Sequence, residues 1–195
     1  MKLGFHLLSA IALVAAACPV RAADEVLENL DTAKSAYQAG KLGETITALD
    51  YAGQLVRQKK GEEAVKLLPP PPSGWTAEDG TSESGGAAMM GGMVTVKRAY
   101  QRESGSRVTI QIQSDSPLMQ SLGMMMSNPM LMSATGAKLE TIKGQKCAIT
   151  TSGSKIELKT LVDNRYIIEI SGEDVKREDI VGFAKAIDYA KLIAL

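Results

Sequence analysis

The sequence predicts an α+β protein, in which an N-terminal helical hairpin precedes a mostly antiparallel sheet with two packed helices. Apolar residues recur at helical spacing over residues 24–67. From residue 94 onward, short stretches alternate apolar and polar residues, as strands with one buried face do. Two more stretches with helical spacing, 117–128 and 174–193, interrupt and close this region. The links between strands are short, which favours antiparallel pairing with helices packed on the sheet.

The N-terminus has the pattern of a secretory signal peptide. Lys2 supplies a positive charge, and residues 7–17 supply a short apolar core. Val20 and Ala22 stand at the −3 and −1 positions, so cleavage is expected between Ala22 and Ala23. A transmembrane anchor is the alternative, but a span needs about 20 apolar residues and this run is shorter. The sequence therefore predicts export to a bacterial periplasm as a soluble protein.

A second mode of export involves Cys18. The sequence Ala15-Ala16-Ala17-Cys18 loosely resembles a bacterial lipobox, in which the cysteine is lipidated and holds the protein on a membrane. Ala15 stands where that motif usually has leucine. A membrane is therefore an expected partner only if Cys18 is lipidated.

Cleavage after residue 22 would remove the chain's only histidine, His6, and leave Cys147 as the one remaining thiol. Catalysis by Ser-His-Asp or Cys-His groups, and metal sites with histidine ligands, are then excluded. An internal disulfide is excluded as well. Cys147 alternates with apolar residues in a predicted strand, which predicts a buried, unreactive thiol.

Charge and motifs exclude further classes of function. The chain has 22 basic and 22 acidic residues; without Lys2 and Arg21 the balance is 20 to 22, a net charge of −2. This argues against nucleic-acid binding, which needs basic patches. Paired carboxylates, a G-x-S-x-G elbow and a phosphate-binding loop are absent from the sequence. We expect neither an enzyme nor a cofactor.

Residues 23–68 are predicted to form the helical hairpin and a short third helix. Gly40 is placed as a helix-ending glycine, and Gly61 is expected to break the second helix. The expected apolar faces consist of Val26, Leu30, Ala33 and Tyr37, and then Ile46, Leu49, Ala52, Leu55 and Val56. These faces are expected to pack on the rest of the chain or on a second subunit, which would make a homodimer.

Residues 34–55 resemble the middle of a single tetratricopeptide repeat. The matching residues are Ala36, Tyr37, Gly40, Lys41, Leu42, Glu44, Ile46, Leu49 and Ala52, whereas Thr45 stands where the repeat has a smaller residue. A solenoid needs about three repeats to bury its faces, and the sequence has one copy. The resemblance therefore implies one hairpin and not a peptide-binding superhelix.

Residues 69–92 are expected to form a connector that also contains the first strand. The run from Pro69 to Pro72 cannot continue a helix and favours an extended conformation. Trp75 opens the short strand, and residues 79–92 form a loop rich in glycine and serine. The α+β domain is then expected to span residues 93–195.

Six further strands are expected in the α+β domain. They cover residues 94–100, 108–112, 137–142, 146–151, 156–162 and 166–170. Between the second and third of these, Ser116 is a good N-cap and Pro117 suits the first helical position. This helix is expected to end near Asn128, because Pro129 follows.

Three local sequences in this region carry a family resemblance: Gly74-Trp75, Gly144-Gln145-Lys146 and residues 163–172, DNRYIIEISG. With the middle helix and the closing helix, their layout is similar to the PsbP/Mog1-like group, which includes small exported bacterial proteins of the DcrB type. Members of that group are mostly non-enzymatic accessory or binding proteins. The resemblance therefore implies such a role, although a fold alone does not fix function.

Methionine is the unusual component of the composition, because all nine methionines after Met1 lie between residues 89 and 132. On the helix 117–128, the residues expected to face the sheet are Leu118, Leu122, Met125 and Met126. Met119 and Met124 would then point elsewhere. Together with Met130, they form a predicted surface for a protein partner or an apolar ligand.

Two other interpretations of the methionines stay open. Thioethers are soft ligands that suit Cu(I), and the candidate ligands are Met89, Met93, Met126 and Met130. Alternatively, the methionines only fill the core and loops. The sequence favours an exported, non-catalytic binding or accessory protein of the periplasm, whose partner is a protein or envelope component. A methionine-based Cu(I) binding protein is the alternative.

Overall fold

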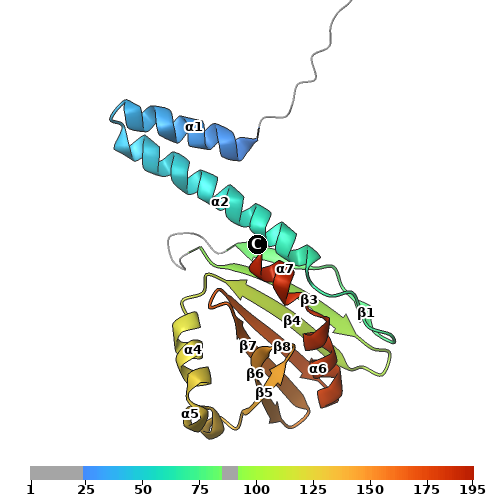
Figure 1. Ribbon diagram of the computed structural model, residues 1–195. Coiled ribbons are helices and arrows are strands. Elements are labelled where there is room, and N and C mark those ends of the chain that lie inside the picture. The colour runs from blue at the N-terminus through green and yellow to red at the C-terminus, as the bar shows by residue number, and fades with distance from the viewer. Residues whose placement is uncertain (1–23, 85–91) are drawn as a thin grey trace, which may run out of the picture.

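The structure is a computed structural model that describes residues 24–84 and 92–195 (Figure 1). The expected signal peptide, its cleavage site at Ala22–Ala23, Cys18 and Met89 lie outside the described residues. The helices are α1 (Glu25–Gln38), α2 (Leu42–Lys66), α4 (Met119–Ser127), α5 (Pro129–Ala134), α6 (Arg177–Ala186) and α7 (Tyr189–Ile193). The strands are β1 (Thr76–Ala77), β2 (Thr81–Ser84), β3 (Val94–Gln101), β4 (Arg107–Ser114), β5 (Lys138–Ile142), β6 (Gln145–Ser152), β7 (Lys155–Val162) and β8 (Tyr166–Glu173).

The strands of the described residues form a single antiparallel sheet in the order β1-β3-β4-β8-β7-β6-β5. The short strands β1 and β2 both pair with β3, one after the other along the same edge. Hairpin turns join β5 through β8, and residues in the left-handed conformation, such as Lys143 and Asn164, form two of these turns. The predicted α+β class and the antiparallel sheet are confirmed.

Helices cover the two faces of the sheet unequally. The apolar core lies on one face, where alternate strand residues such as Ile110, Leu158 and Ile168 meet Phe183 of α6 and Leu192 of α7. The C-terminal part of α2 belongs to the same core. The short helices α4 and α5 lie on the other face, at the end formed by β5, β6 and β7 (Figure 1). Within the described residues, no helix is both long enough and apolar enough to span a membrane.

Helix α2 runs without a break through Gly61, so the predicted short third helix is wrong. Gly61 is buried, and a Cβ atom built there would lie 2.0 Å from Ser82 Oγ and 3.2 Å from Val94 Cγ1. The glycine therefore serves the close approach of α2 to β2 and β3, not the end of a helix. Gly40, in contrast, adopts a positive φ of 72° between α1 and α2, as predicted.

The hairpin packs through small residues, and of the predicted faces only Ala33 and Ala52 are buried. Its buried residues are Ala33 and Ala36 of α1 with Thr45, Ala48 and Ala52 of α2. Alanines at helical spacing let the two helix backbones approach closely. Most of the larger side chains of the predicted stripes remain exposed.

The proline run is part of the packed core region. Pro69 is buried, and its carbonyl accepts a hydrogen bond of 2.7 Å from the buried Tyr100 hydroxyl. Arg98 Nη1 donates to the carbonyl of Leu68 at 3.1 Å. Trp75 packs edge-on against Phe183, with 5.2 Å between the ring centroids. Residues 68–75 thus join α2 to the sheet through fixed contacts.

Three other elements differ from their predictions. Strand β2 lies within the stretch expected to be loop, and it pairs with β3 although all four of its residues are exposed. A second short helix, α5, follows the middle helix. The predicted closing helix divides at Ile187 into α6 and α7, because Asp188 caps a new helix by accepting from the Lys191 amide at 3.1 Å.

Candidate functional site

The methionine-rich segment folds into two short helices that meet at Asn128. The first begins at Met119, two residues later than predicted, and its N-cap is Leu118 and not Ser116, whose Oγ accepts from the Leu118 amide at 3.3 Å. Asn128 ends α4 with an extended backbone, and its Oδ1 accepts from the Met130 amide at 3.0 Å. Pro129 then occupies the first position of α5, where a missing N–H costs nothing.

An apolar hollow of about 160 Å³ lies between these helices and the sheet. Its lining residues come from α4, α5, the turn between α5 and β5, and the outward positions of β6 and β7, and they are Leu122, Met125, Met132, Thr135, Ala137, Ala148, Thr150, Glu157 and Lys159. The hollow is large enough for one or two aliphatic or thioether side chains. Successive residues of a strand point to opposite faces of the sheet. Ala148 and Glu157 therefore face the hollow, because their neighbours Cys147 and Leu158 face the core.

The methionines predicted to face outward differ in exposure. Met124 and Met130 have exposed fractions of 73% and 82%, so both point into solvent beside the hollow. Met119 is half-buried. Leu118 was expected to face the sheet, but it is the N-cap residue of α4 and is 62% exposed. The expected inward positions Leu122, Met125 and Met126 are half-buried or buried.

The charged residues of the hollow are paired with one another. Lys159 Nζ lies 3.8 Å from Glu157 Oε2 and 3.4 Å from Glu169 Oε2. A hydrogen bond from Lys155 lowers the pKa of Glu157 and outweighs its partial burial, which acts in the opposite direction. Glu157 therefore stays ionised, and the lysines beside it balance its charge. The apolar side chains of the hollow are the part that could contact another molecule.

The three candidate copper ligands within the described residues, Met93, Met126 and Met130, do not share one helix face. Met126 is buried under α4, whereas Met130 is exposed on α5, and Asn128 interrupts the helix between them. Met93 is half-buried and directly precedes β3. Within residues 24–84 and 92–195, no three His, Cys, Asp or Glu side chains gather at a spacing that could hold a metal ion.

The thiol of Cys147 is fully buried, which confirms the predicted burial. Its Sγ donates to the carbonyl of Gln145 at 3.5 Å, and burial raises the pKa of this thiol. A raised pKa keeps the sulfur protonated and poorly nucleophilic. The arrangement is that of a core residue.

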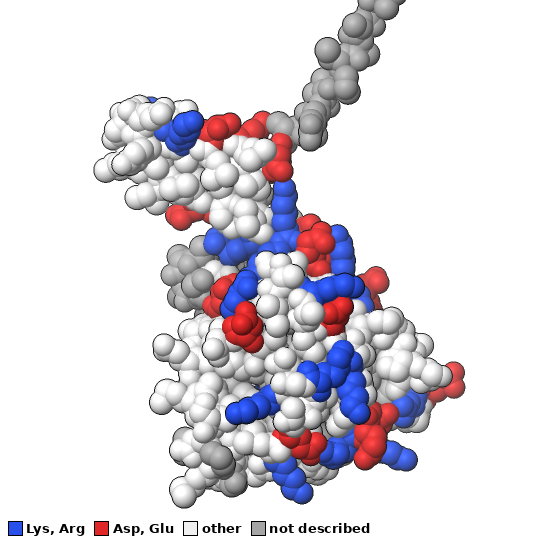
Figure 2. Space-filling view, in the orientation of Figure 1, with Lys and Arg blue, Asp and Glu red and all other residues white. Residues whose placement is uncertain are grey.

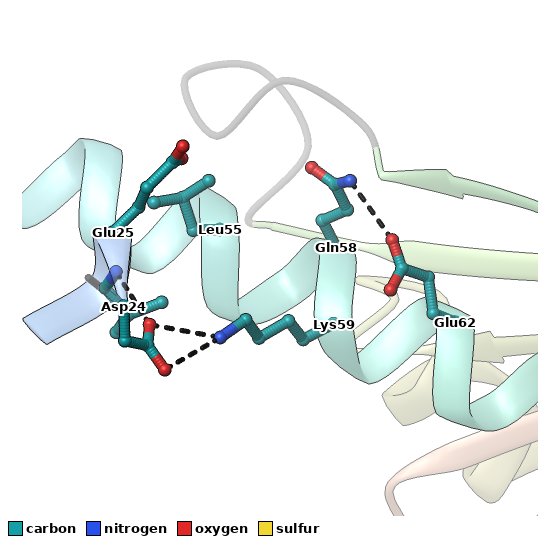
Figure 3. Close-up of a pocket in the computed structure, with 7 residues that line it drawn as sticks. Asp24, Glu25, Leu55, Gln58, Lys59 and Glu62 are labelled. Atoms are coloured by element: carbon teal, nitrogen blue, oxygen red, sulfur yellow. Dashed lines mark hydrogen bonds and ion pairs between the residues drawn. The ribbon is translucent and has the colours of Figure 1, made fainter. Parts of the chain in front are cut away.

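A second hollow, of about 460 Å³, lies where α1 begins beside α2 (Figure 3). Figure 3 shows Lys59 reaching Asp24, and its Nζ lies 3.1 Å from each carboxylate oxygen. Gln58 donates to Glu62 at 3.1 Å in the same close-up. Lys59 lowers the pKa of Asp24, and the Val26 amide, which Asp24 caps, adds to this effect. These polar groups bind one another and hold the start of α1 against α2.

Sequence reasoning missed the partners that complete the apolar hollow. Met132 was not singled out, because α5 was not expected. Ala148 and Thr150 could not be placed opposite α4 without the strand register. The alternation of apolar and polar residues in 146–159 was the available sign that these strands have a second, half-covered face.

Comparisons with known proteins yield little. No protein-family model matches the sequence, and no curated protein matches it significantly. A solved structure of a GTP binding regulator from Thermotoga maritima is similar over 63% of this chain and 82% of that chain, with 11% identity and a TM-score of 0.39. A likeness this distant supports no inference about function, and the resemblance to PsbP/Mog1-like proteins stays a prediction.

Proposed function

We propose that this chain is an exported, non-catalytic binding protein of the bacterial periplasm, whose α4–α5 surface receives an apolar segment of a partner protein. The observation that carries the proposal is the apolar hollow with Met124 and Met130 exposed beside it. Methionine side chains are unbranched and polarizable, so they adapt to apolar partners of varied shape. Exposed methionines next to an apolar hollow favour a recognition surface over simple packing.

A non-catalytic role is supported by the state of the reactive groups. The thiol of Cys147 is buried and protonated. The charged residues at the hollow, Glu157 and Lys159, are engaged in ion pairs. A binding function needs only the surface that these groups leave apolar.

Export is supported by the position of α1 in the chain. This helix begins at Glu25, and its N-cap is Asp24. Cleavage between Ala22 and Ala23 would therefore leave the cap and the whole hairpin intact. We expect the protein recovered from the periplasm to have a mass that begins at Ala23; a mass that begins at a lipidated Cys18 would place it on a membrane instead.

The binding surface is favoured over copper because of where the thioethers lie. A Cu(I) site needs its sulfur ligands to converge. Met126 lies under α4 and Met130 lies in solvent on the next helix. Recognition of an apolar partner needs no such convergence.

Site-specific photocrosslinking in intact cells tests the proposal. A photoreactive amino acid would replace Met124 or Met130, and a matched control would carry it at Lys185, which is exposed on α6. We expect one adduct of the same mass from positions 124 and 130 and not from 185. The adduct from position 124 should weaken at least tenfold when Met130→Glu places a charge beside the apolar hollow.

Two outcomes would overturn the proposal. One is the absence of any adduct from positions 124 and 130; the other is the same set of adducts from position 185. Circular dichroism of each variant checks that the fold is retained, which is expected because the replaced side chains are exposed.

A further inference from the structure

The hairpin of α1 and α2 carries exposed large apolar side chains that the α4–α5 surface does not use. Their exposed fractions lie between 43% and 66%, and they are Leu27, Leu30, Tyr37, Leu42, Ile46, Leu49, Tyr51 and Val56. Scattered apolar residues on a surface are ordinary, but a contiguous set on one face is not. Their positions on the two helices decide which case applies.

All of these residues except Tyr51 form one stripe on each helix. In α1 the stripe runs through positions 27, 30, 34 and 37, and in α2 through 42, 46, 49, 53 and 56. Both alternate steps of three and four, which is the heptad spacing of an a/d seam. The α2 stripe consists of Leu42, Ile46, Leu49, Gly53 and Val56, none of which is charged, and the guanidinium of Arg57 lies against Gly53.

The two stripes lie on the same side of the hairpin. At about 100° per residue, each stripe is turned about 90° from the alanines that pack α1 against α2, and in the same rotational sense. Because the helices are antiparallel, equal rotations bring both stripes to one face. Figure 2 shows the hairpin as a largely uncharged surface that projects beyond the sheet.

The opposite side of the hairpin is polar. Its two shallow hollows are lined mainly by hydrophilic residues, including Thr32, Ser35, Glu44, Gln58, Lys59 and Glu62. The hairpin is therefore amphipathic from side to side, as one half of a four-helix bundle is.

We infer that the apolar face of the hairpin binds the same face of a second copy of this chain, so that two hairpins form a four-helix bundle. The exposed side chains correspond to roughly 600 Å² of surface per copy, which approaches the ~800 Å² that each partner buries in a standard interface. This is at the upper limit of the largest apolar patch of an ordinary monomer, about 300–600 Å².

Charge favours a second copy over other occupants. A self-complementary interface places each residue against the same surface, so a charged face would repel itself. Lys34 is the one charged residue at a stripe position, and a single lysine in an a/d seam is compatible with pairing and helps to fix its register. The guanidinium of Arg57 reaches Gly53 from beside the α2 stripe. A membrane surface would instead call for a row of basic residues along the face. The inference does not depend on the α4–α5 surface.

Sedimentation equilibrium of the full mature chain tests the inference. We expect the wild type to have twice the monomer mass at micromolar concentrations. The variant Ile46→Lys/Leu49→Lys should raise the dimer Kd by at least 100-fold, because it sets like charges against each other in the seam. Both side chains are exposed in the single chain, so circular dichroism and the thermal midpoint should change little.

The matched control is Tyr51→Lys. Tyr51 is also an exposed apolar residue of α2, but it lies outside the stripe, so its variant should remain a dimer. As a second measurement, Ile46→Cys should form an interchain disulfide under mild oxidation, whereas Tyr51→Cys should not. Cys147 does not interfere, because it is buried.

Three results would overturn the inference: a monomeric wild type at 100 µM, a dimer that the double lysine variant leaves unchanged, or a dimer that Tyr51→Lys disrupts equally. A separate experiment measures whether the protein co-sediments with vesicles of phosphatidylethanolamine and phosphatidylglycerol. A monomer that co-sediments with vesicles through this face would assign the face to a membrane and also overturn the inference.

Discussion

At the scale of single residues, the thiol of Cys147 shows how strongly position determines reactivity. The side chain is fully buried on the core face of β6, opposite Thr160 of β7. Burial, as the largest effect, raises the pKa of the thiol. Its sulfur is therefore both protonated and inaccessible to a reagent in the folded protein.

We predict that Cys147 in the native protein reacts with a thiol reagent at about pH 8 at least 100-fold more slowly than in denaturant, since reaction requires opening of the core. The measurement is the rate of colour release from an aromatic disulfide reagent. The Tyr51→Cys variant is the positive control and should show one fast thiol, because Tyr51 is exposed and lies outside the face that is inferred to pair. Equal rates in native and denatured protein would mean that the core around β6 opens freely.

Asp115 joins the hairpin to the sheet by charge. It adopts a positive φ of 57° after β4, and its Oδ2 lies 2.8 Å from Lys60 Nζ of α2. Partial burial acts to raise the pKa of this carboxyl, but the hydrogen bond and the positive charge of Lys60 outweigh it and lower the pKa below its usual value. The stability from this pair is therefore present above the unfolded pKa, near 3.8, and is lost as the pH falls through the folded pKa.

We predict that Asp115→Asn lowers the free energy of unfolding by a few tenths to about 1 kcal/mol at neutral pH, because the pair is half exposed and screened. Asparagine tolerates the left-handed backbone, so the change removes charge and little else. Urea denaturation at neutral pH and near pH 3 checks the sign, since the difference from wild type should shrink in acid. Asp163→Asn is the control at neutral pH: it lies at another left-handed residue, for which the described structure records no ion pair, and it should leave the free energy of unfolding nearly unchanged.

At the scale of elements, the contact between α2 and the edge of the sheet depends on Gly61. A side chain here would meet Ser82 and Val94 at 3.2 Å or less. A glycine inside a helix ordinarily costs about 1 kcal/mol relative to alanine, so its presence points to this close approach.

We predict that Gly61→Ala lowers the free energy of unfolding by about 1–3 kcal/mol despite the gain in helix propensity, because α2 must move away from β2 and β3. The measurement is chemical denaturation. Gly43→Ala is the control, since a Cβ atom there meets nothing within 4 Å, and it should be neutral or stabilising. Removing the nearest obstacle in Gly61→Ala/Ser82→Gly should recover part of the loss; no recovery would mean that Ser82 is not the obstacle.

The sequence predicts elements well where one periodicity dominates. Alternation over residues 94–170 locates β3 to β8 within a few residues, and their turns carry Gly or Asn. Strand β2 was missed because its four exposed, polar residues show no alternation; only pairing with β3 makes it a strand. Helix α5 is not predicted, because a proline usually ends the helix before it, whereas Pro129 is also the first residue of a new helix.

The candidate site was only partly predictable for similar reasons. Helical phase was sufficient to place Met124 outward, whereas Met130 lies beyond the end of the predicted helix. It failed for Leu118, which is the exposed N-cap residue of α4. In the hairpin, the predicted faces combine large residues, most of which are exposed, with Ala33 and Ala52, which belong to the contact. The sequence pattern does not distinguish an apolar face that packs within the chain from one that stays exposed in a single copy.

At the scale of the whole molecule, helix α2 belongs both to the hairpin and to the core on the sheet, and these two parts differ in how much apolar surface they bury. The sheet and its core helices bury most of the large apolar side chains, whereas α1 packs against α2 through small ones. Regions with few buried apolar contacts open at lower free energy than the core.

We predict that backbone amides of α1 and of α2 before Gly53 exchange with deuterium at least tenfold faster than those of β4, β7 and β8. If two copies pair through the hairpin, protection of these amides should rise with protein concentration in the wild type and not in the double lysine variant. Hydrogen exchange read by mass spectrometry at low and high concentration measures both effects. Equal exchange rates for the amides of the hairpin and of the sheet would contradict the prediction that the hairpin opens at lower free energy.

The unbroken course of α2 sets a geometric constraint on anything that the protein assembles. A helix of 25 residues is about 37 Å long, and its far end is fixed to the sheet through Gly61 and the carbonyls of Leu68 and Pro69. The hairpin cannot swivel on the sheet as a domain on a flexible linker can. Two copies joined at their hairpins would hold their methionine surfaces at one fixed separation, and a divalent partner would be selected by the spacing of its two binding segments as well as by their chemistry.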